Sequence, residues 1–342
     1  MAGVSEGTVD RVLHNRGEVS NVSREAVETV LRDIEYTPNI LARSLASKKQ
    51  YRFVCLIPAY QQGGYWQSID DGFDTALEEF VHYNVDINKR YFNQYDPHSF
   101  SSVAEEILLG EIPEAVFIAP IFRAETLRFT DQLKKMHIPF SFIDSLVEDA
   151  PFVTYYGQHS AQSGSVAAKL LSGSLSQQSK VLIVRTKRRG ESFSNQTTNR
   201  YQGFTQYLQE QDSTCQLIEV ELAADDDARN QIILHRIFQD NAEIRAAITF
   251  NSKVFRLAKF LIDIDRTDVI LVGYDLLREN VEYLKKGVIS YLIAQRPEKQ
   301  AYFSVRDMCH QLIFQKEIQR INYVPIDILM KENIDYYEDF RD

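Results

Sequence analysis

The stretch VILVGYDLLRENVEYLKKGVISYLIAQ, residues 269–295, contains the pattern that decides the fold. It begins with the apolar run VILVGY (269–274) and continues with NVEYLKKG, whose apolar residues recur at helical spacing. It ends with a second apolar run, YLIAQ (291–295). Two short apolar runs separated by an amphipathic helix are typical of a βαβ unit, in which the two strands lie parallel in one sheet.

The same alternation extends backward to Tyr51, with helical patterns such as IDDGFDTALEEFV between the apolar runs. The other predicted strands are 52–57, 85–90, 115–119, 139–144, 180–184, 217–221 and 246–250. These strands are too many for one compact parallel sheet, and the pattern restarts near Lys180. We therefore predict an α/β protein with two doubly wound parallel-sheet lobes, joined by several chain crossings, with a ligand site between them.

The first 50 residues have a different pattern. Residues 5–13 predict a short helix capped by Ser5, and Ser23 is expected to cap a second helix. A third short helix is predicted after Pro38. An α-helical head is therefore expected to precede the two lobes.

The charge distribution limits where nucleic acid can bind. The 342 residues carry a net charge of −10, and residues 1–50 contain seven basic and seven acidic side chains, so the whole excess of acid lies after residue 50. An acidic body is repelled by a phosphate backbone, which leaves the head as the part that touches DNA. The sequence has no long apolar span and no apolar signal segment, and its three cysteines form no pairing pattern, so we expect a cytoplasmic protein.

The motifs that doubly wound enzymes commonly carry are absent. No G-x-G-x-x-G and no G-x-S-x-G turn follows a predicted strand, and neither a P-loop nor an H-E-x-x-H pair occurs. The acidic run at 225–227 stands where a helix begins, which indicates capping rather than metal binding. We expect no catalytic residue, no metal and no cofactor, and this balance favours a sensor over an enzyme.

Several segments resemble the lactose-repressor-like (LacI/GalR) family of bacterial transcription regulators. AGVSEGTVDRVLHN is similar to the turn and recognition helix of their helix-turn-helix, and YTPNILARSLASKK is similar to their hinge helix. GQHSAQSGSVAAKLL, NRYQGF and the stretch that begins VGYDLLRENVEYLKKG resemble their effector-binding core, which is similar to periplasmic sugar-binding proteins. The order and spacing of these segments are more specific than any one of them.

The resemblance implies a division of the chain. It predicts a partial helix-turn-helix over 1–36, a hinge helix and linker over 37–50, and an effector-binding core over 51–342. Within the core, one lobe is expected to contain 51–157 and 297–324, and the other 158–296 and 325–342. In this family another helix precedes AGVS, so we expect the first helix of the motif to be missing, Val9, Val12, Val27 and Val30 to lose cover, and the chain as written to bind operator DNA poorly.

The resemblance also implies the residues that contact DNA. Position by position it assigns this role to Glu6, Gly7, Thr8, Arg11, Arg43 and Leu45. Leu45 corresponds to the leucine that wedges into the minor groove, although a core contact of a short helix is the alternative. Asp10 departs from the family pattern, because many relatives carry serine there, and this leaves its role on DNA open.

The resemblance likewise implies an effector site at the carboxyl ends of the strands. The predicted contacts are Tyr60, Tyr65, Trp66, Asp144, Arg200, Asn251, Asp275 and Gln295. Gly63 and Gly64 are expected to hold the aromatic rings on a loop, where their faces would stack on a sugar ring. Arg200 offers a planar fork of donors, and Asp275 accepts from two hydroxyls. His159 and Ser160 depart from the commoner Asp and Asn, which leaves the identity of the ligand open.

The predicted function is a ligand-responsive transcriptional regulator, expected to be a repressor. Its expected partners are double-stranded operator DNA, a small sugar-like effector and a second copy of the chain in a homodimer, without membrane contact. A solute-binding protein of a transporter is one alternative, although residues 1–50 disfavour it. A sugar-acting enzyme is the other, although no motif in the sequence requires it.

Overall fold

The structure is a computed structural model, and it describes residues 2–13, 16–34, 49–173, 175, 179–187, 194–223 and 226–338. The chain divides into two compact units, Met1–Lys49 and Gln50–Asp342, which we describe separately. In the part of the chain described here, no helix has both the length and the apolar character to cross a membrane.

The N-terminal unit contains helices α1 (Glu6–Leu13) and α2 (Asn21–Asp33). Ser5 accepts a hydrogen bond from the backbone N–H of Thr8, as its predicted capping role requires. The prediction that Ser23 caps the second helix is wrong, because Ser20 caps it and the Ser23 backbone N–H donates to Ser20 Oγ. Two positions expected to lose cover, Val12 and Val27, are buried. The predicted hinge helix falls almost wholly outside the described residues.

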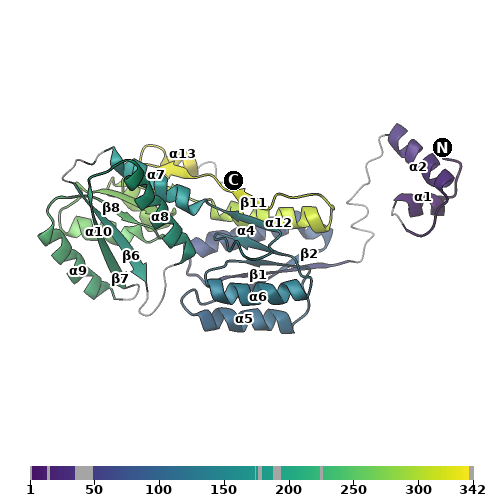
Figure 1. Cartoon of the computed structure of the whole chain (residues 1–342), viewed down its shortest axis with the longest axis horizontal. Helices are drawn as coiled ribbons and strands as arrows, with labels where there is room; N and C mark the ends of the chain where they lie inside the picture. The colour runs from purple at the N-terminus through teal and green to yellow at the C-terminus, as the bar shows by residue number, and fades with distance from the viewer. Residues whose placement is uncertain are drawn as a thin grey trace. The chain divides into compact units, whose positions relative to one another are not determined.

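The first lobe of the core is built on a six-stranded sheet in the order β11-β5-β4-β3-β1-β2, and every neighbouring pair of strands is parallel. Figure 1 shows helices on both of its faces. The strands are β1 (Tyr51–Pro58), β2 (Val85–Phe92), β3 (Ala115–Ile118), β4 (Phe140–Ile143), β5 (Thr154–Gly157) and β11 (Ile321–Tyr323). The helices are α4 (Tyr65–Phe80), η1 (Val81–Tyr83), α5 (Pro97–Leu109), α6 (Arg123–Lys135) and α12 (Pro297–Leu312).

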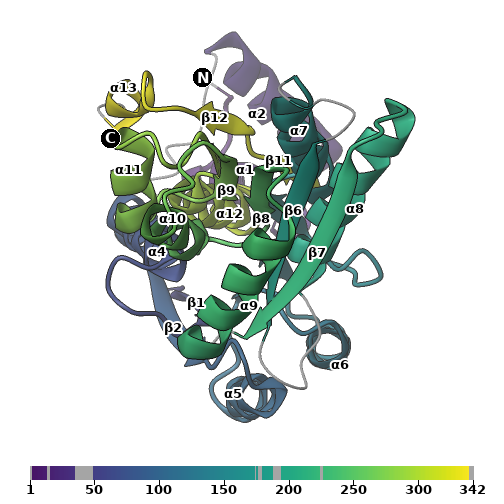
Figure 2. The same cartoon turned by 90° about the vertical axis from the view of Figure 1, so that its left-hand side faces the viewer.

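The second lobe repeats this design with the order β12-β10-β9-β8-β6-β7, in which only β12 is antiparallel to its neighbour. Figure 2 faces this lobe, with α9 and α10 on one side of the strands and α7 and α8 on the other. The strands are β6 (Lys180–Lys187), β7 (Gln216–Ala223), β8 (Ile244–Thr249), β9 (Ile270–Tyr274), β10 (Tyr291–Ala294) and β12 (Asp327–Leu329). The helices are α7 (Ser160–Ser172), α8 (Asn195–Glu210), α9 (Asp227–Asp240), α10 (Val254–Asp263), α11 (Arg278–Lys285) and α13 (Ile334–Glu338).

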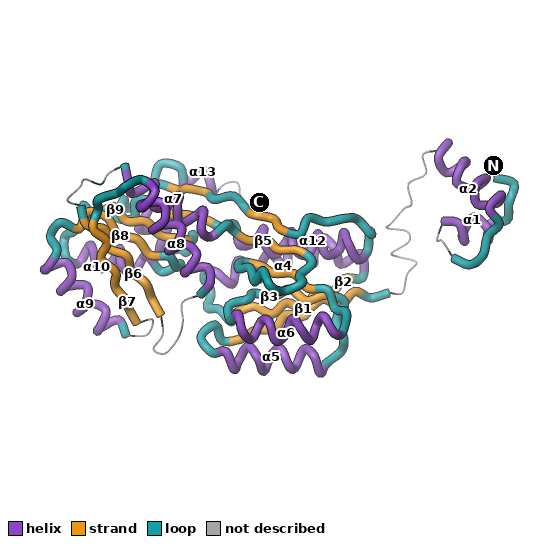
Figure 3. The backbone as a smooth tube through the Cα atoms, in the orientation of Figure 1, coloured by secondary structure: helices purple, strands orange, loops and turns teal. Residues whose placement is uncertain are grey.

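The predicted α/β fold with two doubly wound lobes is confirmed, and Figure 3 shows the strands in two separate groups. All nine strands predicted from the sequence are present, with ends that differ by a few residues. Three strands were missed: β5, β11 and β12 are three or four residues long, and such short segments give no clear apolar run. Asp226, in the acidic run, is the N-cap of α9 and accepts from the backbone N–H of Arg229, as the capping prediction requires.

Close helix contacts in both lobes depend on glycine. A Cβ at Gly72 of α4 would lie 2.2 Å from the backbone oxygen of Glu298 in α12. In the second lobe, Gly164 of α7 and Gly203 of α8 face each other's helix, and a Cβ at these positions would lie 1.9 Å from Arg200 O and 1.8 Å from Ala161 O. The helices therefore touch through their backbones, and the α7–α8 contact fixes the turn of α8 that carries Arg200.

One buried glutamine joins the three segments that pass between the lobes. Gln158, which follows β5, has a side chain that is 1% exposed. Its Nε2 donates to Ala294 O at 3.0 Å, at the end of β10 where that crossing begins, and to Pro325 O at 3.3 Å, between β11 and β12. Because each acceptor belongs to a different crossing, this carboxamide holds the three crossings together.

Candidate ligand-binding site

The two lobes place an aspartate at equivalent positions. Asp144 follows β4 in the first lobe and Asp275 follows β9 in the second, and both strands are fourth in the sheet counted from β2 or β7. Both residues have left-handed backbones, with φ of 67° and 70°. Aspartate tolerates this conformation better than most residues, and it turns the chain sharply where a parallel strand ends. Both carboxylates are buried, at 5% and 6% exposure.

A chain of hydrogen bonds connects the two carboxylates. Asp144 Oδ1 accepts from Tyr65 Oη at 2.6 Å and from Gln196 Nε2 at 3.1 Å. The same Gln196 nitrogen donates to Gln295 Oε1 at 3.0 Å, and Gln295 Nε2 donates to Asp275 Oδ1 at 2.6 Å. This series of hydrogen bonds therefore runs from Asp144 in the first lobe, through Gln196 of α8 and Gln295 of the β10 crossing, to Asp275 in the second lobe.

Arg200 supplies the positive charge of this region. Its side chain is 1% exposed, its Nη1 donates to Phe250 O at 2.9 Å, and its guanidinium carbon lies 3.9 Å from the centre of the Tyr274 ring. Its Nε and Nη2 are buried and have no hydrogen-bond partner among the described residues. These two N–H groups point the same way and form the edge that holds two acceptor atoms side by side.

Burial makes additional negative charge unfavourable here. Desolvation raises the pKa of the Asp275 carboxyl to about 6, and Arg200 and the Gln295 hydrogen bond oppose this rise. Desolvation also raises the pKa of Asp144, against the hydrogen bond from Tyr65 and the charge of Arg200. The Asp144 charge adds to the rise at Asp275, so the two carboxylates interact with each other and share one guanidinium.

A cavity of about 450 Å³ lies against this cluster. Tyr65, Asp275 and Gln295 form part of its wall, together with the start of α12 and residues of α13 such as Tyr336. Its lining comes from both lobes and from the crossing segments, and its volume is in the range of small-molecule sites.

Of the effector residues predicted from the sequence, the structure brings together Tyr65, Asp144, Arg200, Asp275 and Gln295. Asn251 follows Phe250, whose backbone oxygen accepts a hydrogen bond from Arg200. The Asn251 side chain itself is used locally, because its Oδ1 accepts from the Lys253 backbone N–H at 2.8 Å.

The structure places Tyr60 outside the cluster, and Trp66 touches the cluster through an edge-on contact with the Tyr65 ring, at 5.1 Å between ring centres. The prediction that Tyr65 and Trp66 lie on a loop is wrong, because both residues belong to α4, which begins at Tyr65. Trp66 packs into the apolar core of the first lobe. Tyr60 donates to the buried Asp70 at 2.9 Å, in a separate network with Lys89 and Tyr91.

Two glutamines of the cluster were missed from the sequence. Gln196 joins the carboxylates as described, and Gln300 of α12 accepts from the Asp144 backbone N–H at 3.0 Å and donates to Gln295 O at 2.8 Å. Glutamine inside a helix has no distinctive pattern in the sequence. The position of Gln196 one helical turn before Arg200 is the one signal that would have found it.

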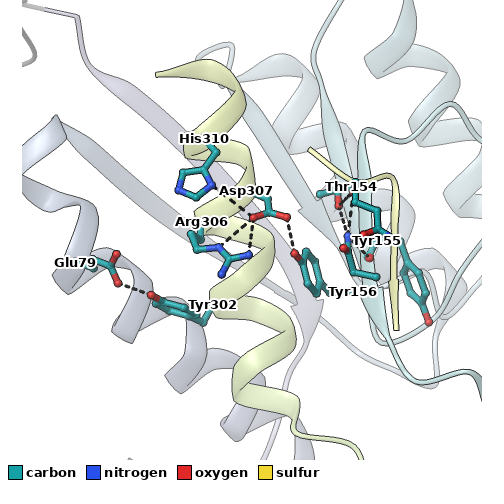
Figure 4. A network of polar contacts seen from close by, with 10 residues as sticks. Glu79, Thr154, Tyr155, Tyr156, Tyr302, Arg306, Asp307 and His310 are labelled. Carbon is teal, nitrogen blue, oxygen red and sulfur yellow. Dashed lines mark hydrogen bonds and ion pairs between the residues drawn. The ribbon is translucent and has the colours of Figure 1, made fainter. Parts of the chain in front are cut away.

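A second polar network lies in the first lobe and anchors α12 (Figure 4). The buried Asp307 accepts from Tyr156 Oη at 2.5 Å and from Nε and Nη2 of Arg306 at 3.0 and 2.9 Å. On the same helix Tyr302 donates to Glu79 of α4 at 2.5 Å. These contacts tie α12 to β5 and α4, and every carboxylate in them has a partner, so the network has a structural role.

The predicted DNA contacts on α1 lie at the surface. Glu6, Gly7 and Arg11 are exposed and Thr8 is half-buried, with its hydroxyl 2.9 Å from Ser5 Oγ. Arg43 and Leu45 lie outside the described residues.

Comparison with known proteins identifies both parts of the chain. The model for bacterial regulatory proteins of the lacI family matches residues 1–39, and a periplasmic binding protein domain matches residues 53–316. The HTH-type transcriptional regulator DegA of Bacillus subtilis is 24% identical over 155 residues, which are 44% of this chain and 43% of that protein. The sucrose operon repressor of Streptococcus mutans is 26% identical over 171 residues, 50% of this chain and 49% of that protein.

The matches to these curated relatives span about half of their length or less. A solved structure is matched over its whole length: that of a Bacteroides fragilis protein assigned to the LacI transcriptional regulators. It is 39% identical, has a TM-score of 0.80, and the match covers 84% of this chain and 100% of that one. The chain therefore belongs to the lacI family of bacterial regulatory proteins, and its two-lobed core is a periplasmic binding protein domain.

Proposed function

We propose that this protein is a transcriptional repressor whose affinity for operator DNA depends on a small, uncharged, hydroxyl-rich effector bound between the lobes. The observation that supports the effector is the cluster of Asp144, Asp275 and Arg200. It gathers two acceptors and one fork of donors from both lobes in a buried setting. A ligand that contacts both lobes changes the balance between their arrangements, because it shifts an equilibrium by its differential affinity for the two states.

The chemistry of the cluster favours a sugar or a sugar derivative. Carboxylates accept from hydroxyl groups, and the arginine edge donates to two hydroxyl oxygens on neighbouring carbons. Two interacting carboxylates disfavour a phosphate or carboxylate ligand. The name of the Streptococcus mutans relative, a sucrose operon repressor, agrees with this class of effector.

DNA binding is assigned to residues 1–36, followed by a hinge over 37–50 that transmits the state of the core. Glu6, Gly7, Thr8 and Arg11 are the proposed contacts on α1, with Arg43 and Leu45 following in the hinge. We propose a cytoplasmic homodimer that binds a palindromic site, since two heads double the contacts that one head makes. The core of residues 51–342 then acts as a sensor without catalytic activity.

The test begins with a thermal-shift screen over neutral sugars, sugar acids and nucleosides. DNA sequences that the full chain selects from a random library then serve as probes for fluorescence anisotropy. Addition of the sugar that the screen identifies should change the operator dissociation constant by roughly 5- to 150-fold, the usual range of allosteric coupling. A sugar that binds the protein but leaves the DNA affinity unchanged contradicts the proposal.

A further inference from the structure

Gln196 connects the two lobes through a single nitrogen atom. It is the second residue of α8, in the second lobe, one helical turn before Arg200. Its Nε2 donates to Asp144 Oδ1 of the first lobe at 3.1 Å and to Gln295 Oε1 of the β10 crossing at 3.0 Å. Both hydrogens of the amide nitrogen are therefore used, one of them across the interface between the lobes.

The acceptors that Gln196 occupies are the ones a hydroxyl-rich ligand needs. Each carboxylate oxygen has about two lone-pair directions, and at Asp144 Oδ1 Tyr65 and Gln196 occupy both of them. Asp144 Oδ2 accepts from Ser145 Oγ at 3.1 Å. A ligand hydroxyl that donates to Asp144 Oδ1 must therefore replace one of these two donors, and the Gln196 amide at 3.1 Å is the longer contact than Tyr65 at 2.6 Å.

The unpaired edge of Arg200 indicates what else such a ligand offers. Two other arginines of this chain use the same Nε and Nη2 edge to hold both oxygens of an aspartate. Arg296 binds Asp327 at 2.6 and 3.1 Å, and Arg266 binds Asp268 at 2.7 and 3.3 Å. In Arg200 both atoms of this edge are buried without an acceptor among the described residues. Two N–H groups of Arg200 are therefore buried away from water, and no described group of the protein accepts their hydrogen bonds.

We propose that Gln196 is a specificity-determining residue of the effector site and an internal competitor of the effector; this inference rests on the proposed function. Its amide takes the place of a ligand hydroxyl and bridges the lobes when no effector is bound. An effector replaces it with a pair of neighbouring hydroxyls, which donate to Asp144 and Gln295 and whose oxygens accept from the Arg200 edge. Anionic sugars are excluded, because the departure of Gln196 leaves Asp144 without one of its donors, and the charge of Asp275 remains close to it.

The first experiment needs no ligand. Double electron–electron resonance on the full chain measures the distance between spin labels at Glu78→Cys in α4 and Ile232→Cys in α9, both exposed positions, with Cys215 replaced by Ser. Gln196→Ala should broaden the distance distribution and move it to longer distances. Gln202→Ala, at an exposed position of the same helix, is the control. Identical distributions for Gln196→Ala and Gln202→Ala overturn the bridging role.

The second experiment measures binding by calorimetry, with neutral mono- and disaccharides, glucose 6-phosphate and glucuronate as probes. The neutral sugar that binds should bind Gln196→Ala about three- to tenfold more tightly, because roughly one net hydrogen bond no longer has to be broken. Unchanged or weaker binding in Gln196→Ala, or preferred binding of an anionic probe, overturns the competitor role. If no sugar binds the wild type, the proposed effector class fails, while the distance measurement still decides whether Gln196 bridges the lobes.

Discussion

At the scale of single residues, the site places two buried carboxylates, Asp144 and Asp275, close to the buried guanidinium of Arg200. Arg200 lowers the pKa of both Asp144 and Asp275, while desolvation raises both. For Asp275 desolvation is the larger effect, and its folded-state pKa of about 6 lies above the ordinary value of 3.8. The folded protein therefore holds this proton more tightly than the unfolded chain does, so this group makes stability fall as the pH rises from about 4 to about 6.

Because the buried charge of Asp275 lowers stability at high pH, its removal in Asp275→Asn should raise stability there. The variant should raise the free energy of unfolding by about 1–3 kcal/mol at pH 8, where the wild type carries the buried charge, since each pKa unit corresponds to ~1.4 kcal/mol. At pH 4.5 the gain should largely disappear. Urea unfolding at both pH values measures the difference. Asp265→Asn is the control, because Asp265 also has a positive φ, of 55°, but is exposed. A gain of the same size at both pH values would show that the charge of Asp275 is not its cause.

Most of the polar residues of the site could be predicted, because their signal in the sequence is local. Asp144, Asp275 and Gln295 each stand directly after an apolar strand, and the ends of parallel strands meet at one edge of a sheet. Trp66 could not be placed, because its direction depends on the residue at which α4 begins. Gln196 was missed because its role depends on a partner in the other lobe, 52 residues earlier in the chain.

At the scale of elements, the contact between α7 and α8 determines where Arg200 lies. The contact depends on Gly164 and Gly203, which approach the partner helix closer than any Cβ permits. The sequence predicted the helices and the nine longer strands from their periodicity. It did not reveal this glycine contact, because a glycine inside a helical pattern only lowers the predicted helix propensity. Its packing role becomes visible once the neighbouring helix is known.

Gly203→Ala should therefore destabilise the protein by more than about 2 kcal/mol, because its Cβ would lie 1.8 Å from a backbone oxygen and the helices would have to separate. Effector affinity should fall as well, since Arg200 moves with α8. Gly173→Ala is the control, because no atom lies within 4 Å of a Cβ at that position. Chemical unfolding and calorimetry check both effects. Equal stability of the two variants would mean that α7 and α8 accommodate the methyl group without separating.

At the scale of the whole molecule, the three crossings act as one hinge because Gln158 joins them. Gln158→Ala leaves Ala294 O and Pro325 O without this donor, and we expect a loss of about 1–3 kcal/mol in the free energy of unfolding. Amide hydrogen exchange should become faster in residues 294–296 and at Val324 and Ile326, on either side of Pro325, which has no amide hydrogen. Gln162→Ala, an exposed change on α7, serves as the control. Unchanged exchange in both crossing segments would show that Gln158 does not hold them together.

The proposed dimer is also a property of the whole molecule. Sedimentation velocity at micromolar concentration should give a species of twice the 39.5 kDa mass of one chain. The interface is expected on the lobes, because the two short helices described in the head, α1 and α2, offer little surface to bury. A single species with the mass of one chain at that concentration would contradict the dimer.

If one effector binds to groups of both lobes, a substitution in either lobe weakens its binding, and calorimetry measures this. The wild type, Asp144→Ala in the first lobe and Arg200→Ala in the second lobe are each titrated with the sugar that the screen identifies. Each variant should bind it more weakly by about 1.5–3 kcal/mol, the cost of losing a charged hydrogen bond. Affinity equal to that of the wild type in both variants would place the effector outside this cluster and contradict the account.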